Sequence, residues 1–255
     1  GAGVLSSFIV GGHDGKWEYF VAGEPIEQMS DATEEATSGQ LVISKSCYEL
    51  LEADPTIKRQ CRLNGQELES GHYLLHSVAA DRGEMPLAVR ASGKHLLIER
   101  VAPALSAKMY DSLRCFVPAI IEERAARGQS GAWVSEHRKL ISVFMKVLNL
   151  GARPCEVHDM ETVHKAVSVV QEKIKRFGGT ITRLITDDKG TRFLIAFGLP
   201  GHQHEDDEMR AVLSSLDILA ALNEIPAWDA KSYLVSSLKV AIGITTGQVF
   251  CGEAG

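Results

Sequence analysis

Two short clusters of acidic and histidine side chains are the first candidates for chemistry in this sequence. Asp187 and Asp188 are adjacent carboxylates, the ligands that hard divalent cations prefer. His202 and His204, followed by Glu205 and Asp206, combine donors that could bind zinc or another metal. Both clusters also have simpler interpretations, which we favour. Residues 187–190 have the composition of a hairpin turn, and the histidines precede a helix in a loop with no distant Cys/His partner pattern.

The cysteines and the other histidines show no catalytic or metal-binding pattern. The five cysteines are widely spaced and form no CxxC pair, which indicates reduced thiols of a cytosolic protein. No neighbour in the sequence marks Cys115 or Cys155 as a nucleophile. We expect surface or hydrogen-bonded structural roles for His72, His76, His158 and His164.

Composition excludes several classes of function. An apolar content of 45% and a charged content of 24% over 255 residues are typical of a globular protein with a sizeable core. The net charge of -6 argues against a nucleic-acid polymer as partner, which needs a basic face, but it permits a small phosphorylated ligand. No run of 18 apolar residues predicts a membrane span, and the N-terminus shows no signal-peptide pattern.

The elements before residue 104 are predicted from apolar spacing and from turn residues. A helix should open at Pro25, where a missing N–H is harmless, and Ser44 should cap a second helix that Asp54-Pro55 closes. The Asn64-Gly65 pair should form a turn between two strands. The predicted strands are residues 4–10, 17–21, 41–43, 57–63 and 72–77.

From residue 104 the pattern predicts a helix broken at Pro118, a linker at 125–131, and then β-α-β-β-α-β. Gly178 should stop the first helix of this series. We expect the second helix to bury Met209, Val212, Leu216, Leu219, Ala220 and Leu222. Residues 239–255 should form a strand, a tight turn at Gly247 and another strand. The order predicts an α+β, ferredoxin-like half with one sheet and helices on one face.

The two ends of the chain share a glycine spacing of eight residues, from Gly3 to Gly11 and from Gly247 to Gly255. We interpret them as the same point in two copies of one module. The chain would then hold the back half of one copy, a linker, and the front half of the next. Its start at glycine in place of methionine agrees with an excised segment.

Four motifs in this chain resemble those of the class III nucleotide cyclases. Residues 243–255 fit G-I-x-x-G-x-V-x-x-G-x-x-G, and residues 18–23 fit E-Y-x-V-x-G. The helix at 25–36 stands where the family has V-N-x-A-A-R, and residues 38–44 fit G-x-[IL]-x-[IV]-S. Residues 192–201 and 249–252 resemble the soluble, tandem-domain adenylyl cyclases in particular.

The resemblance implies attack of a ribose 3′-hydroxyl on the α-phosphate of ATP, giving cyclic AMP and pyrophosphate with Mg²⁺ or Mn²⁺. In tandem members two aspartates of the first copy bind the metals, and an Asn and an Arg of the second copy act on the phosphate. Both sets would lie outside this chain. We therefore expect no catalytic or metal-binding residue here, and no activity of the segment alone.

Family positions that do fall within the chain are altered. Glu27 and Asp31 stand at the Asn and Arg positions of the first copy, where carboxylates would repel phosphate. Lys146 stands near the first metal aspartate of the second copy. Ser30 is nearest to the basic residue of bicarbonate-responsive relatives, so bicarbonate control is not expected. Arg183 occupies a position that reads the purine edge; the alternative is an exposed arginine paired with a nearby acid.

We expect residues 1–100 to be the back part of a first cyclase-like domain, 101–135 a helical linker, and 136–255 the front part of a second. The leading hypothesis is a segment of a cytoplasmic lyase for cyclic AMP biosynthesis, in which the two copies pair and bind ATP or GTP. The alternatives are a catalytically dead cyclase-homology module that dimerises or senses nucleotide, and an unrelated ferredoxin-like binding module.

Overall fold

The computed structural model describes residues 1–80, 107–128, 136–150, 157–187, 190–229 and 234–251. Contacts divide the chain into a first unit, residues 1–5 and 23–112, and a second unit, residues 6–22 and 113–255. This division groups residues by packing and does not mark where one cyclase-like domain ends and the next begins. The domain boundaries expected from the sequence therefore stay a prediction. Within the described residues, no helix is long and apolar enough to cross a membrane.

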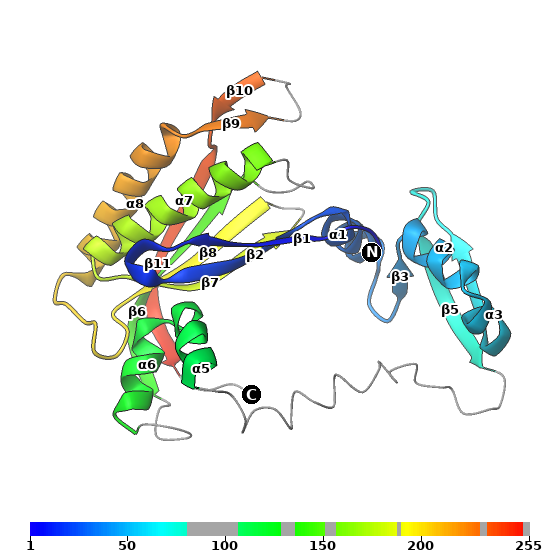
Figure 1. Ribbon diagram of the computed structural model, residues 1–255, viewed down its shortest axis with the longest axis horizontal. Helices are drawn as coiled ribbons and strands as arrows, with labels where there is room; N and C mark the ends of the chain where they lie inside the picture. Colours follow the sequence, from blue (N-terminus) through cyan, green and yellow to red (C-terminus); the bar gives the residue numbers. More distant parts are fainter. Residues whose placement is uncertain (81–106, 129–135, 151–156, 188–189, 230–233, 252–255) are drawn as a thin grey trace. The chain divides into compact units, whose positions relative to one another are not determined.

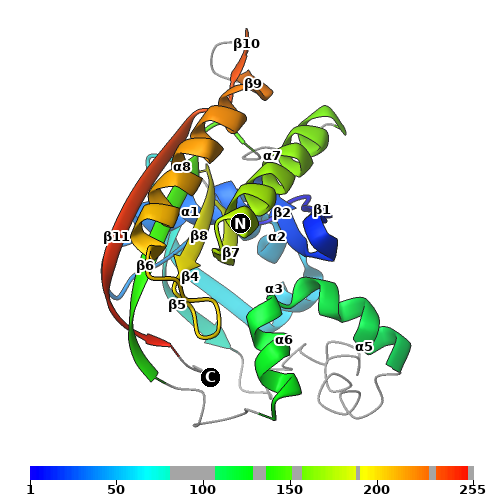
Figure 2. The same cartoon turned by 90° about the vertical axis from the view of Figure 1, so that its left-hand side faces the viewer.

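A four-stranded antiparallel sheet organises the second unit, with strand order β11-β6-β8-β7. Helices α7 and α8 lie on one face of it (Figures 1 and 2). The predicted β-α-β-β-α-β order and the α+β class are confirmed, with a small β9–β10 hairpin inserted before β11. The bounds are β6 (Glu136–Val147), α7 (Val157–Arg176), β7 (Thr180–Asp187), β8 (Gly190–Phe197), α8 (Asp207–Asn223), β9 (Pro226–Asp229), β10 (Leu234–Ser237) and β11 (Val240–Cys251).

The core of this unit follows from two sequence periods. Alternate residues of β6 and β8 face the helices, and the valines of α7 at helical spacing pack against them. Gly178 ends α7 with a φ of +79°, a conformation that glycine adopts without strain. The central buried side chains are Val143, Met145, Val147, Val163, Val167, Val170, Phe193, Ile195 and Phe197.

The predicted core face of α8 is wrong in large part. Met209 and Leu216 are 58% and 57% exposed, and Val212 is also exposed, although Leu222 is buried as expected. The buried face instead carries small residues, Ala211, Ser214 and Ser215, with Ile218. Small side chains let a helix approach its neighbours closely. The buried Ser215 hydroxyl has a hydrogen-bond partner, because it donates to the Ala211 carbonyl at 2.7 Å.

The predicted turn at Gly247 is also wrong, because β11 is one continuous strand. Gly247 pairs with Leu140, and every residue of β11 has a partner on β6. Both strands are twelve residues long, so the ladder of hydrogen bonds continues through the glycine. Glycine permits a turn but does not require one.

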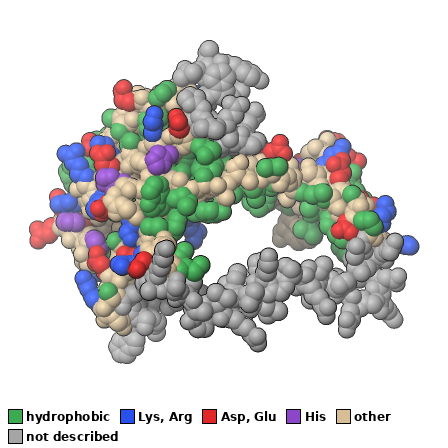
Figure 3. Space-filling model, in the orientation of Figure 1, with side chains coloured by type: hydrophobic (Ala, Val, Ile, Leu, Met, Phe, Trp, Pro, Cys, Tyr) green, Lys and Arg blue, Asp and Glu red, His purple; other side chains and the backbone are tan. Residues whose placement is uncertain are grey.

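A hairpin from the start of the chain packs into the second unit. It consists of β1 (Ser6–Gly11), the short 3₁₀ turn η1 (His13–Gly15) and β2 (Trp17–Ala22). Val10, Phe20 and Ala22 join the core beside α7. The Ser168 hydroxyl donates to the Gly11 carbonyl at 3.2 Å, across a sequence separation of 157 residues. Figure 3 shows hydrophobic side chains gathered over this hairpin, where Ile9 and Tyr19 are exposed.

The predicted helix at 104–126 is broken as expected at Pro118. The described part consists of α5 (Ala107–Leu113), a 3₁₀ turn η3 (Arg114–Phe116) and α6 (Ala119–Ala126). Pro118 lies between the two last elements, and its carbonyl accepts from Ile121 N at 3.0 Å. The predicted linker at 125–131 runs beyond the described residues after Gly128.

The first unit contains α1 (Glu24–Glu35) and a three-stranded sheet of order β3-β5-β4. Ser44 caps α2 as predicted, accepting from Cys47 N at 3.2 Å. The strand predicted at 57–63 is wrong at its start: Asp54 accepts from Ile57 N and begins a helix there. The other bounds are β3 (Leu41–Ile43), α2 (Lys45–Ala53), α3 (Pro55–Gln60), β4 (Cys61–Glu67) and β5 (Tyr73–Ala80).

The predicted Asn64-Gly65 turn is wrong as well. The pair lies inside β4 as a register shift against β5, and the chain turns later, where Leu68 N donates to the His72 carbonyl. A bulge explains the glycine, because a Cβ on Gly65 would lie 2.6 Å from the Leu74 carbonyl oxygen.

Candidate functional site

The helix-free face of the sheet is the first candidate surface. Arg183 pairs with Leu194, Leu194 with Phe144, and Phe144 with Gly243, which makes one row across four strands. Side chains of directly opposed residues share a face. Phe144 is 46% exposed and Leu194 40% exposed, so this row lies on the open side.

A bulge in β7 brings Arg183 to this face. Ile181 pairs with the buried Ile195, so normal alternation would place Arg183 on the helix side as well. The register shifts between Ile181 and Arg183, and Arg183 then pairs with Leu194. The Thr182 hydroxyl fixes the shift by donating to the Leu194 carbonyl at 2.9 Å.

Two further cations lie on the open face. Lys146 pairs with Arg192, and Arg192 pairs with Ile185, in the row next to that of Arg183. None of the side chains directly opposed in these two rows is acidic. Positive charge gathered on this face favours an anionic ligand, such as a phosphate.

This face does not fit a divalent metal ion. Lys146, at the position where the resemblance implies a metal aspartate, is a cation beside a second cation. Over the part of the chain that the structure describes, no three His, Cys, Asp or Glu side chains gather as a metal site. Asp187 ends β7 opposite Gly190, as expected for a hairpin, and Asp188 lies outside the described residues.

The histidines of the loop before α8 have structural partners. The Asp207 carboxylate accepts from His204 N at 3.0 Å, and its Oδ1 lies 3.2 Å from His204 Nδ1. His202 Nε2 lies 3.5 Å from a Glu123 carboxylate oxygen. Asp207 is buried, and its part in fastening this loop was not predicted. The altered family positions Glu27, Ser30 and Asp31 all lie on α1 in the first unit.

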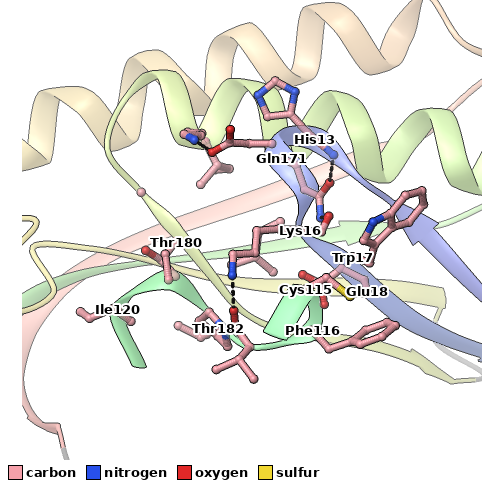
Figure 4. A pocket seen from close by; sticks show the side chains of 18 of the residues that line it. His13, Lys16, Trp17, Glu18, Cys115, Phe116, Ile120, Gln171, Thr180 and Thr182 are labelled. Atoms are coloured by element: carbon pink, nitrogen blue, oxygen red, sulfur yellow. Dashed lines mark hydrogen bonds and ion pairs between the residues drawn. The ribbon is translucent and has the colours of Figure 1, made fainter. Parts of the chain in front are cut away.

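A pocket of about 390 Å³ is the second candidate site, and it lies wholly within the second unit. Its walls are the β1–β2 hairpin, the segment from η3 into α6, and the passage from α7 into β7 (Figure 4). Trp17, Phe116 and Ile120 are among its apolar residues, and Glu18 and Gln171 among its polar ones. The sequence pattern gave no signal for it, because these walls lie far apart in the chain.

Hydrogen bonds to the hairpin build one side of this pocket. The Gln171 amide accepts from His13 N at 3.1 Å and donates to the Lys16 carbonyl at 3.0 Å. The Lys16 ammonium donates to the carbonyls of Arg114 and Val117 and pairs with Glu122 at 3.2 Å. The hairpin is therefore tied to α7 on one side and to η3 and α6 on the other.

Glu18 is the acid that these contacts leave without a cation. Asp14, the other acid lining the pocket, pairs with Lys175, whereas Glu18 makes no ion pair with any residue that the structure describes. Burial raises the pKa of the Glu18 carboxyl, and a hydrogen bond with Gln171 offsets this only in part.

Comparison with known proteins identifies relatives along nearly the whole chain. The chain is 24% identical to adenylate cyclase type 10 of Oryctolagus cuniculus and 25% identical to that of Rattus norvegicus, each over 257 residues. Each alignment covers 98% of this chain and 15% of the relative, so the chain spans only a small part of the length of these relatives. No protein-family model matches the chain.

Two solved structures of a bacterial light-regulated adenylyl cyclase also align with the chain. Their TM-scores are 0.43 and 0.42, at sequence identities of 16% and 17%. The alignments cover 84% and 82% of this chain, and 73% and 58% of the two structures.

Proposed function

We propose that this chain is a segment of the paired catalytic region of a cytoplasmic adenylyl cyclase. The premise is its similarity to adenylate cyclase type 10 over 98% of its length, which confirms the predicted resemblance to the class III nucleotide cyclases. The parent protein forms cyclic AMP and pyrophosphate from ATP. The segment alone is inactive, because the residues that perform the chemistry lie outside it.

The observation that carries this proposal is the similarity along nearly the whole chain. Two cyclase copies pair in the parent protein. Mg²⁺ or Mn²⁺, held by ligands from outside this segment, would supply activation of the 3′-hydroxyl and neutralisation of phosphate charge. The open face of the sheet faces the nucleotide, and its cations favour the negatively charged substrate.

Arg183 is the residue of this segment that contacts the substrate, at the purine edge. Its guanidinium has only donors, so it can bond to the acceptor N1 of adenine or O6 of guanine. The bulge at Thr182 supports this role, because it moves Arg183 from the helix side to the open face.

The test is a cyclase assay of the full-length parent with ATP or GTP and with each metal. We expect cyclic AMP, and a 10- to 100-fold lower kcat/KM in Arg183→Ala, since a hydrogen bond to a charged donor contributes about 1.5–3 kcal/mol. Arg176→Ala is the matched control, because this exposed arginine lies on α7 and pairs with Asp217 at 3.7 Å.

Absence of product with every nucleotide and metal would contradict the proposal and favour the dead cyclase-homology module. Equal activity of Arg183→Ala and Arg176→Ala would refute the role of Arg183 alone. A preference for GTP would keep the cyclase assignment and change the substrate.

A further inference from the structure

We propose that the pocket between the β1–β2 hairpin, η3–α6 and α7–β7 binds a small apolar molecule that carries a protonated amine, with Glu18 as its counter-ion. The cations of the open sheet face, Arg183, Lys146 and Arg192, do not line this pocket, and the inference does not depend on cyclase activity. The volume of about 390 Å³ lies within the range of roughly 300–1,000 Å³ that is usual for small-molecule sites.

The cations in the wall leave Glu18 free for a ligand. The Lys16 ammonium donates to the carbonyls of Arg114 and Val117 and pairs with Glu122. Lys175 is paired with Asp14. A half-buried carboxylate without a cation loses hydration and gains little in return. Burial accordingly raises the pKa of the Glu18 carboxyl, and a bound ammonium group would compensate for the lost hydration.

Aromatic and aliphatic side chains favour the same ligand. Trp17 and Phe116 line the pocket together with Glu18 (Figure 4). An aromatic face attracts an organic cation by about 0.5–2 kcal/mol. Ile120, Ile174 and Ile181 supply apolar surface for the body of the ligand. An anion is disfavoured, since the two cations are already paired and Glu18 would repel it.

A matched ligand pair tests the proposal in the 255-residue chain. The probes are 2-phenylethylamine and 2-phenylethanol, which share shape and differ in charge, and the readout is amide and indole chemical-shift change in NMR titrations. We expect at least tenfold tighter binding of the amine, with shifts at Trp17 and along η3. Glu18→Gln should remove this preference, whereas Glu224→Gln, an exposed acid at the end of α8, should keep it.

A second variant covers the case in which Glu18→Gln does not fold. Phe116→Leu keeps an apolar side chain at a partly exposed position and removes the ring, so it should weaken the amine severalfold more than the alcohol. Equal binding of both probes, binding of neither at millimolar concentration, or shifts confined to residues outside the pocket would each overturn the proposal.

Discussion

Gly11→Ala should open the contact between the β1–β2 hairpin and α7. Gly11 is buried with a φ of +88°, and an added Cβ would lie 2.5 Å from Gln171 Oε1 and 2.7 Å from its Nε2. The alanine must therefore displace the amide that binds His13 N and the Lys16 carbonyl. Gly15→Ala is the matched control, because Gly15 has a φ of +71° and nothing within 4 Å of an added Cβ.

The two variants differ by a calculable amount. A left-handed alanine costs about 1–2 kcal/mol, which is the whole effect expected at Gly15. Gly11→Ala adds the loss of two hydrogen bonds of about 1 kcal/mol each, so it should cost about 3–4 kcal/mol. In a Gln171→Ala background the amide is already gone, and Gly11→Ala should fall back to about 1–2 kcal/mol.

Native-state hydrogen exchange of the hairpin amides measures the opening of this element by itself, without assuming that the two units unfold together. The double-mutant cycle of Gly11→Ala and Gln171→Ala should give a coupling of about 2 kcal/mol. A coupling below about 0.5 kcal/mol, or equal costs for Gly11→Ala and Gly15→Ala, would refute the reasoning.

Three further outcomes are expected. Burial opposes ionisation of Glu122, but hydrogen bonds from Arg114 and Lys16 outweigh it and lower the pKa of its carboxyl below 4.5. The contact of α6 with the hairpin should therefore be fully present above pH 4.5 and should weaken as the pH falls below that value. The measurement is hydrogen exchange in α6, which should become faster at low pH after correction for intrinsic rates. Glu122→Gln should remove this pH dependence. Phe20 is 1% exposed, so Phe20→Ala should lower the free energy of unfolding of the second unit by about 3–5 kcal/mol in urea titrations. The control Tyr19→Ala, at an exposed side chain, should lower it by less than about 0.5 kcal/mol. Gly247→Ala should stabilise β11 by about 0.4–1 kcal/mol in thermal unfolding, because the residue is extended and nothing lies within 4 Å of an added Cβ. A loss of more than about 1 kcal/mol would instead support a turn at Gly247.

The sequence by itself determined the β-α-β-β-α-β order of the second unit and the family resemblance. Apolar periods predicted α7 and the strands β6, β7 and β8, and local chemistry predicted the cap at Ser44, the break at Pro118 and the stop at Gly178. These features depend on neighbours within a few residues, which a pattern records. Asn64-Gly65 and Gly247 were misread because a glycine that suits a turn also suits a bulge or an extended strand.

Only the tertiary structure decided which faces and which distant segments meet. The apolar residues of α8 form more than one stripe, and packing selected the one with small side chains because it fits closest to its neighbours. A single bulge residue, Thr182, decided that Arg183 lies on the open face. The pocket around Glu18 depends on contacts such as that of His13 with Gln171, 158 residues apart, and sequence periodicity is local and cannot record them.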